Sequence, residues 1–203
     1  MPLKTVLHVG PGHPKSGAKL PSGFQAQTWQ EIRLDIDPAN QPDIIGSMQD
    51  MHAVADESMN AVYSAHNIEH VHAFEVPQVL KEFLRVLKPE GFLVITCPDL
   101  QAVCTLVVQD KLTDPCVSLT RRSDHALGHP LRPRTSPGCR CHHYMAHKCG
   151  FTLRSLTLAL QEAGFQTMAG KRRLHAFSLW MIACKSVVDE AEIRRLAGEL
   201  LPD

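Results

Sequence analysis

The stretch from residue 76 to residue 97 limits the fold of this chain more than any other part of the sequence. Apolar residues in its first half recur at spacings of three and four, which predicts an amphipathic helix over residues 76–87. Pro77 fits the first turn of such a helix, and Pro89 lies just beyond its end. Residues 92–97 are almost continuously apolar, which is typical of a strand covered on both faces of a sheet. A helix followed directly by a buried strand favours the α/β class.

The same two patterns alternate along the rest of the chain. A helix is expected to begin after Thr152 and to end at Gly164, and Asp189 is expected to cap a final helix. A short helix is also expected over residues 22–29, where a serine and a glutamine have the spacing of a capping box. Alternating strands and helices predict an α/β domain with a mostly parallel sheet. Further strands are expected at residues 4–9, 31–36, 43–46, 59–64, 165–169 and 176–184.

Composition and charge exclude several classes of protein. Lys and Arg total 21, as do Asp and Glu, so the formal net charge is zero, which argues against a nucleic-acid partner. No apolar run approaches the roughly 18 residues of a membrane span. The N-terminal segment is interrupted at Gly10 and lacks the long apolar core of a signal peptide. Seven scattered cysteines fit reduced thiols, so we expect a cytoplasmic protein with no membrane partner. The oligomeric state is not predicted.

Residues 110–150 differ from the rest of the chain in composition. They contain four prolines, five histidines and four cysteines, and few aliphatic side chains. We interpret them as a lid or substrate loop inserted after the fifth strand of a single domain over residues 1–203. The cluster from Cys139 to Cys149 lacks the ligand spacing of common structural zinc sites, so no metal is predicted, although a metal-binding alternative stays open. Within the loop, His129, Tyr144 and His147 are the expected substrate contacts.

Polar or glycine-rich groups follow five predicted strands in succession. Two glycines in Gly10-Pro11-Gly12 allow a sharp turn and a close approach of the backbone to a ligand. Asp35 ends the second strand, 23 residues after Gly12, close to the spacing expected for an acid that accepts hydrogen bonds from ribose. The alternative is a solvated aspartate. In parallel sheets the ligand lies beyond the carboxyl ends of the strands, so these groups are expected to lie near one another.

Three further strand ends carry groups of this kind. Asp50 could accept a hydrogen bond from an adenine amino group while Met51 packs on the ring, although a loop aspartate beside a core methionine fits the residues equally well. The fourth strand is followed by residues 66–70, His-Asn-Ile-Glu-His, and the fifth by Pro98 and Asp99. Five such strand ends in succession indicate a ligand-binding site far more specifically than any one of them does.

The chain resembles the class I S-adenosylmethionine (SAM)-dependent methyltransferases, in the branch known as methyltransferase type 11. The most specific stretches are VYSAHNIEHV and VLKEFLRVLKPEGFLVITCPDL, and LHVGPGH, RLDIDP, HKCGFT, EAGF and LWMIACK extend the similarity over nearly the whole sequence. The resemblance implies a Rossmann-like fold: a seven-stranded, mostly parallel sheet with an antiparallel last strand and helices on both faces. It also implies SAM as the cofactor.

Position by position, the resemblance assigns the following roles. Gly10, Pro11, Gly12 and His13 correspond to the loop around the methionine part of the cofactor. Asp35 corresponds to the ribose acid, Ile36 to a residue beside the adenine, Asp50 and Met51 to adenine contacts, and His66 to the position facing the methyl group.

The implied activity is transfer of a methyl group to a small-molecule or glycan-type acceptor. Candidate catalytic groups are His66, His70 and Asp99, and for His70 a structural role is the main alternative. Because Glu90 replaces a glycine of the family pattern, a non-catalytic SAM-binding or regulatory protein is the alternative function. A nicotinamide-dependent oxidoreductase fits the glycine turn and Asp35 but not the later strand ends. The sequence does not identify the acceptor.

Overall fold

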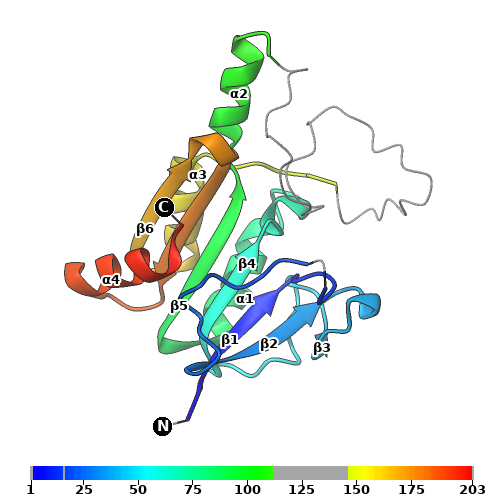
Figure 1. Cartoon of the computed structure of the whole chain (residues 1–203), viewed down its shortest axis with the longest axis vertical. Helices are drawn as coiled ribbons and strands as arrows, with labels where there is room; N and C mark the ends of the chain where they lie inside the picture. Colours follow the sequence, from blue (N-terminus) through cyan, green and yellow to red (C-terminus); the bar gives the residue numbers. More distant parts are fainter. Residues whose placement is uncertain (1, 16, 112–145, 203) are drawn as a thin grey trace.

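A computed structural model describes residues 2–15, 17–111 and 146–202 of the chain. In these residues seven strands form one sheet with the order β3-β2-β1-β4-β5-β7-β6 (Figure 1). The strands are β1 (Lys4–Val9), β2 (Trp29–Asp35), β3 (Ile44–Ile45), β4 (Met59–Ala65), β5 (Leu87–Pro98), β6 (Thr167–Arg173) and β7 (Ser178–Cys184). Pairing is parallel from β3 to β5, whereas β7 is antiparallel to both β5 and β6. The predicted mostly parallel sheet with an antiparallel last strand is therefore confirmed.

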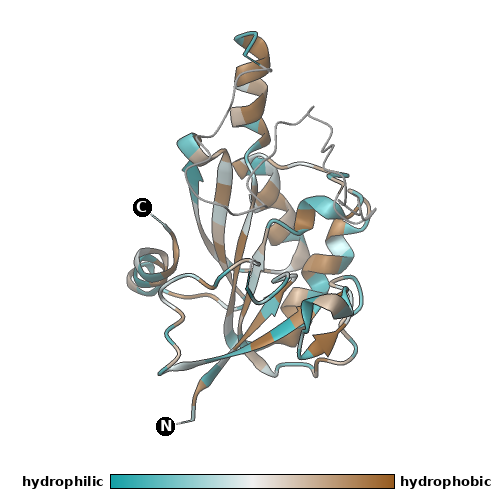
Figure 2. Cartoon of the chain, turned by 45° about the vertical axis from the view of Figure 1, so that its right-hand side comes forward, coloured by the Kyte–Doolittle hydropathy of each residue, from teal (hydrophilic) through white to brown (hydrophobic). Residues whose placement is uncertain are grey.

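Helices cover both faces of this sheet, as predicted. The α-helices are α1 (Val76–Val86), α2 (Leu100–Val108), α3 (Leu153–Ala163) and α4 (Glu190–Leu200), and short 3-10 helices are η1 (Pro38–Asn40), η2 (Ile68–His70) and η4 (Leu174–Ala176). Helices α1 and α3 share one core cluster with the sheet, and α4 belongs to the cluster on the opposite face. The mostly hydrophobic α2 projects beyond the end of the sheet (Figure 1), and its apolar colouring is visible in Figure 2.

The central strands are buried on both faces. Leu7 of β1 pairs with Val62 of β4, which pairs with Leu93 of β5, and all three face the α1 and α3 side. The next residues along, such as Tyr63 and Val94, face the α4 side, because side chains alternate along a strand. The continuous apolar run predicted as a covered strand is thus explained by two separate core clusters, one on each face of the sheet.

Residues 22–29 do not form the predicted helix. They are turns, and Trp29 already begins β2. Phe24 is 7% exposed and packs edge-on against Trp29, with their ring centroids 4.9 Å apart. A Cβ atom at Gly23 would lie 2.5 Å from the carbonyl oxygen of Glu199 in α4. Instead of the predicted helix, these residues form a turn that packs closely against α4 on this face of the sheet.

The strand predicted at 165–169 begins two residues later than expected. The amide of Phe165 donates to the carbonyl of Leu160 and that of Gly164 to the carbonyl of Gln161, which closes α3 in a Schellman-type cap. Phe165 is 2% exposed and packs in the core as part of this cap. The strand can begin only after the cap has turned the chain, and β6 therefore starts at Thr167.

Alanine substitutions at two glycines are predicted to change the stability of the chain in opposite directions. Gly164 has a φ of 114°, so Gly164→Ala is expected to lower the free energy of unfolding by about 1–2 kcal/mol. Gly198 lies on the exposed side of α4 with open space around it, and Gly198→Ala is expected to raise the free energy of unfolding by about 0.5–1 kcal/mol. Urea unfolding of both variants measures these changes. Destabilisation by both alanines would contradict the assigned conformation of Gly198.

Candidate active site

The glycine loop lies at the carboxyl ends of β1 and β4. Gly10 and Gly12 have φ values of 62° and 69°, a conformation that favours glycine. A Cβ atom at Gly10 would collide with the side-chain amide of Asn67. That amide donates through Nδ2 to the carbonyls of Val9, at 2.8 Å, and Ala65, at 3.0 Å, so it ties the two strand ends together. Glycine is required here both by the backbone and by its neighbour.

Asp35 lies against this loop. Its Oδ2 accepts a hydrogen bond from the Gly12 amide at 3.0 Å, and its Oδ1 accepts from the Asp37 amide at 2.9 Å. Asp35 is only 6% exposed. Each carboxylate oxygen has two lone pairs, so one on each oxygen remains for a ligand hydroxyl. Beside it, Ile36 is half exposed, and His13 in the loop is half buried.

The two ligand contacts predicted in the loop after β3 differ in their exposure. Met51 is 1% exposed and packs in the core beneath α1, so its side chain has no exposed face in this conformation. Asp50 is exposed and lines a shallow cavity of about 580 Å³ beside α1, with Gln78 and Phe74 among its neighbours. Of the two residues, only Asp50 is accessible to a ligand in this state.

A clamp from α1 holds this loop in place, and the sequence analysis did not identify it. Glu82 accepts from the Met51 amide at 2.7 Å, and Arg85 donates to the carbonyls of Met51 and Val54, each at 2.9 Å. Arg85 also pairs with Glu82 and Asp56. Its hydrogen bonds hold the pKa of the Glu82 carboxyl below its usual range. The E-x-x-R spacing near the end of α1 was the available signal.

The turn after β4 brings two predicted catalytic residues together around a buried acid. His66 has a φ of 53°, and its amide donates to the carbonyl of Thr96 at 2.8 Å. Its Nδ1 lies 3.4 Å from Oε1 of Glu69, which is 1% exposed. His70 follows in η2 and is less buried than Glu69. The sequence analysis gave Glu69 no role, because its burial depends on contacts with distant segments.

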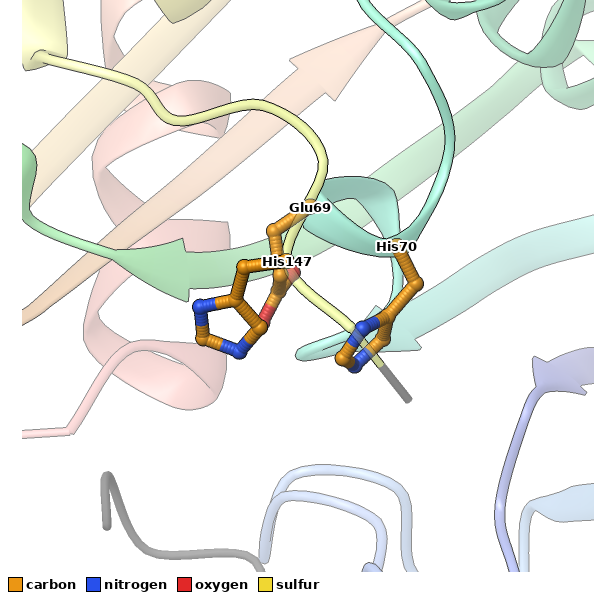
Figure 3. A group of neighbouring side chains, drawn as sticks. All are labelled: Glu69, His70 and His147. Atoms are coloured by element: carbon orange, nitrogen blue, oxygen red, sulfur yellow. The ribbon is translucent and has the colours of Figure 1, made fainter. Parts of the chain in front are cut away.

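One such segment is the stretch that returns from the predicted lid. The amides of Lys148 and Cys149 both donate to the backbone carbonyl of Glu69, at 2.8 and 3.3 Å. The rings of His70 and His147 lie edge to face, with centroids 5.1 Å apart (Figure 3). Partial desolvation lowers the pKa of the exposed His147, and burial raises the pKa of Cys149 to about 11, so both groups favour their neutral forms. Of the predicted substrate contacts, His129 and Tyr144 lie outside the described residues.

Asp99 has a structural position at the end of β5. It is completely buried, and its Oδ1 accepts from the Ala102 amide at 3.2 Å, which caps α2. Its Oδ2 accepts from Nε of Arg172 at 2.7 Å. Because Asp99 is completely buried and paired with Arg172, its carboxylate is not accessible as a proton acceptor in this state.

Comparisons with known proteins agree with this architecture. Residues 21–95 match the family model described as a methyltransferase domain. A SAM-dependent methyltransferase of Thermotoga maritima is 12% identical with a TM-score of 0.56, over 92% of this chain and 84% of that one. A second, from Archaeoglobus fulgidus, is 12% identical with a TM-score of 0.55, over 90% and 86% of the two chains. No curated protein sequence matches the chain. The family match and the shared fold confirm the predicted resemblance to class I SAM-dependent methyltransferases.

The Arg85 clamp can be tested against a surface arginine. Lysine keeps the charge at position 85 but cannot reach two carbonyls and two carboxylates at once, so Arg85→Lys is expected to cost about 1–3 kcal/mol of unfolding free energy. Arg195 makes exposed pairs with residues of its own helix, α4, and Arg195→Lys is expected to change stability by less than about 0.5 kcal/mol. Chemical denaturation measures both. Equal effects would show that the clamp adds nothing beyond a surface ion pair.

Proposed function

We propose that this chain, with the fold of the class I SAM-dependent methyltransferases, transfers a methyl group from SAM to a small-molecule acceptor. One observation carries the proposal. The Gly12 amide and the Asp35 carboxylate meet at 3.0 Å, so the turn after β1 and the acid after β2 share one edge of the sheet. This is the place where parallel α/β sheets bind nucleotide-like ligands.

The residues at this edge fit an adenosyl group. Asp35 would accept from the ribose hydroxyls with its remaining lone pairs, and the Gly10–Gly12 loop would approach the methionine part of the cofactor without side chains in the way. Ile36 and Asp50 are both exposed and would contact the adenine, Ile36 through its apolar surface and Asp50 as a hydrogen-bond acceptor. When bound, SAM supplies a methyl group already activated by its sulfonium centre.

The chain's own contribution to the reaction is mainly positioning. Holding an acceptor in line with the methyl group can account for about 7–11 kcal/mol of the barrier. A proton acceptor is needed only where the acceptor is a neutral hydroxyl or an ammonium group. We assign that role to His66, whose side chain is 32% exposed at the tip of β4. The proposal gives Asp99 a structural role, because the cap of α2 and Arg172 engage its carboxylate.

Two measurements test the proposed activity. Calorimetry should detect binding of SAM and of its demethylated product, but not of NAD. Incubation with methyl-labelled SAM and a panel of hydroxyl, amine and thiol acceptors should then yield a labelled small molecule. Binding of SAM without transfer to any acceptor would favour the non-catalytic alternative, and binding of NAD alone would overturn the proposal.

Asp35 provides the sharpest test of cofactor binding. Asp35→Asn removes the charge that would strengthen its hydrogen bonds to ribose, so SAM binding is expected to weaken by about 1.5–3 kcal/mol, or roughly ten- to a hundredfold. Asp37→Asn is the matched control, because the Asp37 side chain accepts from the Ala39 amide and asparagine can also cap η1. Titration calorimetry on both variants gives the comparison. Unchanged affinity in Asp35→Asn would contradict the ribose assignment.

A further inference from the structure

Three side chains that commonly bind metals converge beside His66. Glu69, His70 and His147 each offer one ligand atom, and these atoms all lie within 4.8 Å of one another. Figure 3 shows that Glu69 and His70 come from η2, whereas His147 comes from the segment that returns to the sheet. Residues 77 positions apart in the sequence thus meet at the end of β4.

The carboxylate of Glu69 lacks the partners that a buried charge requires. Neither Oε1 nor Oε2 has a hydrogen-bond partner among the residues that the structure describes, although Glu69 is 1% exposed. Its one ion-pair distance in this part of the chain is the 3.4 Å to Nδ1 of His66. Burying a carboxylate that accepts no hydrogen bond is costly, and buried carboxylates are normally hydrogen-bonded or bound to a metal. A cation at this point would satisfy Glu69.

The backbone contact of His70 leaves one of its ring nitrogens able to bind a cation. Nδ1 of His70 lies 3.3 Å from the carbonyl of Ala146, and because a carbonyl can only accept, Nδ1 must carry the proton. Nε2 of His70 is then left with the lone pair. A ligating histidine that donates its other N–H to a backbone carbonyl is the usual arrangement at metal sites.

Hydrogen bonds of the backbone hold the segment that carries His147 in place without any metal. The amides of Lys148 and Cys149 bond to the Glu69 carbonyl, and the Cys149 thiol donates to the carbonyl of Ile68 at 3.4 Å. These contacts pin the segment containing His147 against η2. The ligand atoms would need to close from 4.8 Å to about 3.4 Å, the separation in a tetrahedral site with bonds near 2.1 Å. Side-chain rotation can supply a shift of that size.

We propose that Glu69, His70 and His147 bind a divalent transition-metal ion of the zinc type. Two imidazoles and one carboxylate suit such ions and leave at least one coordination position open. The sequence analysis predicted no metal and considered only the cysteine and histidine cluster over residues 139–149, so the proposed site shares His147 alone with that cluster.

The position of the site adds a consequence that rests on the proposed function. His66 is the residue expected to face the methyl group, and it lies next to Glu69. An acceptor hydroxyl bound at the open position would be more acidic, because the metal stabilises the alkoxide or phenolate. Its proton would pass to His66, its oxygen would form the new bond to the methyl carbon, and the bond from that carbon to sulfur would break. The favoured acceptor class is therefore a hydroxyl compound.

Metal binding is measured on the untagged full chain, stripped with a chelator and titrated with Zn²⁺, and then with Co²⁺ to record its visible absorption. We expect one tight zinc ion per chain and a cobalt spectrum typical of four- or five-coordinate nitrogen and oxygen ligands. Glu69→Gln and His147→Ala should each weaken zinc binding at least tenfold. His175→Ala, in η4 and outside the cluster, should leave it unchanged.

Further variants distinguish the proposed metal site from the cysteine cluster, and binding of SAM tests the proposed function separately. If Cys139→Ser with Cys141→Ser abolishes zinc binding while Glu69→Gln retains it, the metal belongs to the cysteine cluster and the proposal is overturned. A chain with no tight zinc also overturns it. Because His147 is exposed, His147→Ala keeps the test valid should Glu69→Gln fail to fold. SAM calorimetry on the metal-free chain tests the proposed function independently, since the adenosyl site uses none of the three ligands.

Discussion

Burial of the central strands on both faces is the constraint on which the rest of this structure depends. The backbone groups of β1, β4 and β5 are satisfied by pairing with neighbouring strands, and the side chains of these strands fill two cores. Polar groups are therefore concentrated where the strands end. Parallel pairing brings the carboxyl ends of the five strands from β3 to β5 to the same edge, so residues far apart in the sequence become neighbours there. Gly12 and Asp35 are the clearest example, and the Asn67 amide, wedged against Gly10, extends the same edge to β4.

The two halves of this edge differ in how their charges are satisfied. Asp35, Glu82 and Asp99 are all carboxylates that accept from backbone amides or arginines, and they make the loops rigid. Glu69 is only 1% exposed but is surrounded by imidazoles rather than by fixed donors. Asp35 keeps a lone pair on each oxygen for a hydrogen-bond donor such as a ribose hydroxyl, whereas Glu69, which has no fixed donor among the described residues, would suit a cation. This contrast separates the adenosyl half of the site from the half beside η2.

Sequence patterns predicted the regular elements well where local chemistry decides them. The limits of β1 and the caps of α3 and α4 were confirmed, because strand alternation, Thr152, Gly164 and Asp189 act within one turn. The helix expected over residues 22–29 was wrong, because packing of Phe24 against Trp29 and α4 outweighs a local capping pattern. The start of β6 was wrong by two residues, since Phe165 belongs to the preceding cap. The roles predicted for individual site residues stay predictions.

By itself the sequence determined the α/β class, the order of elements, the resemblance to class I methyltransferases and the strand ends that carry polar groups. Those properties follow from periodicity and from short motifs, which depend on near neighbours in the chain. Only the tertiary structure decided which polar groups meet, which are already engaged, and which are buried without a partner. Met51, Asp99 and Glu69 could not be told apart as core, cap or candidate ligand until distant segments had packed around them. Burial and long-range pairing are properties of the folded chain, because both arise from contacts between residues distant in sequence.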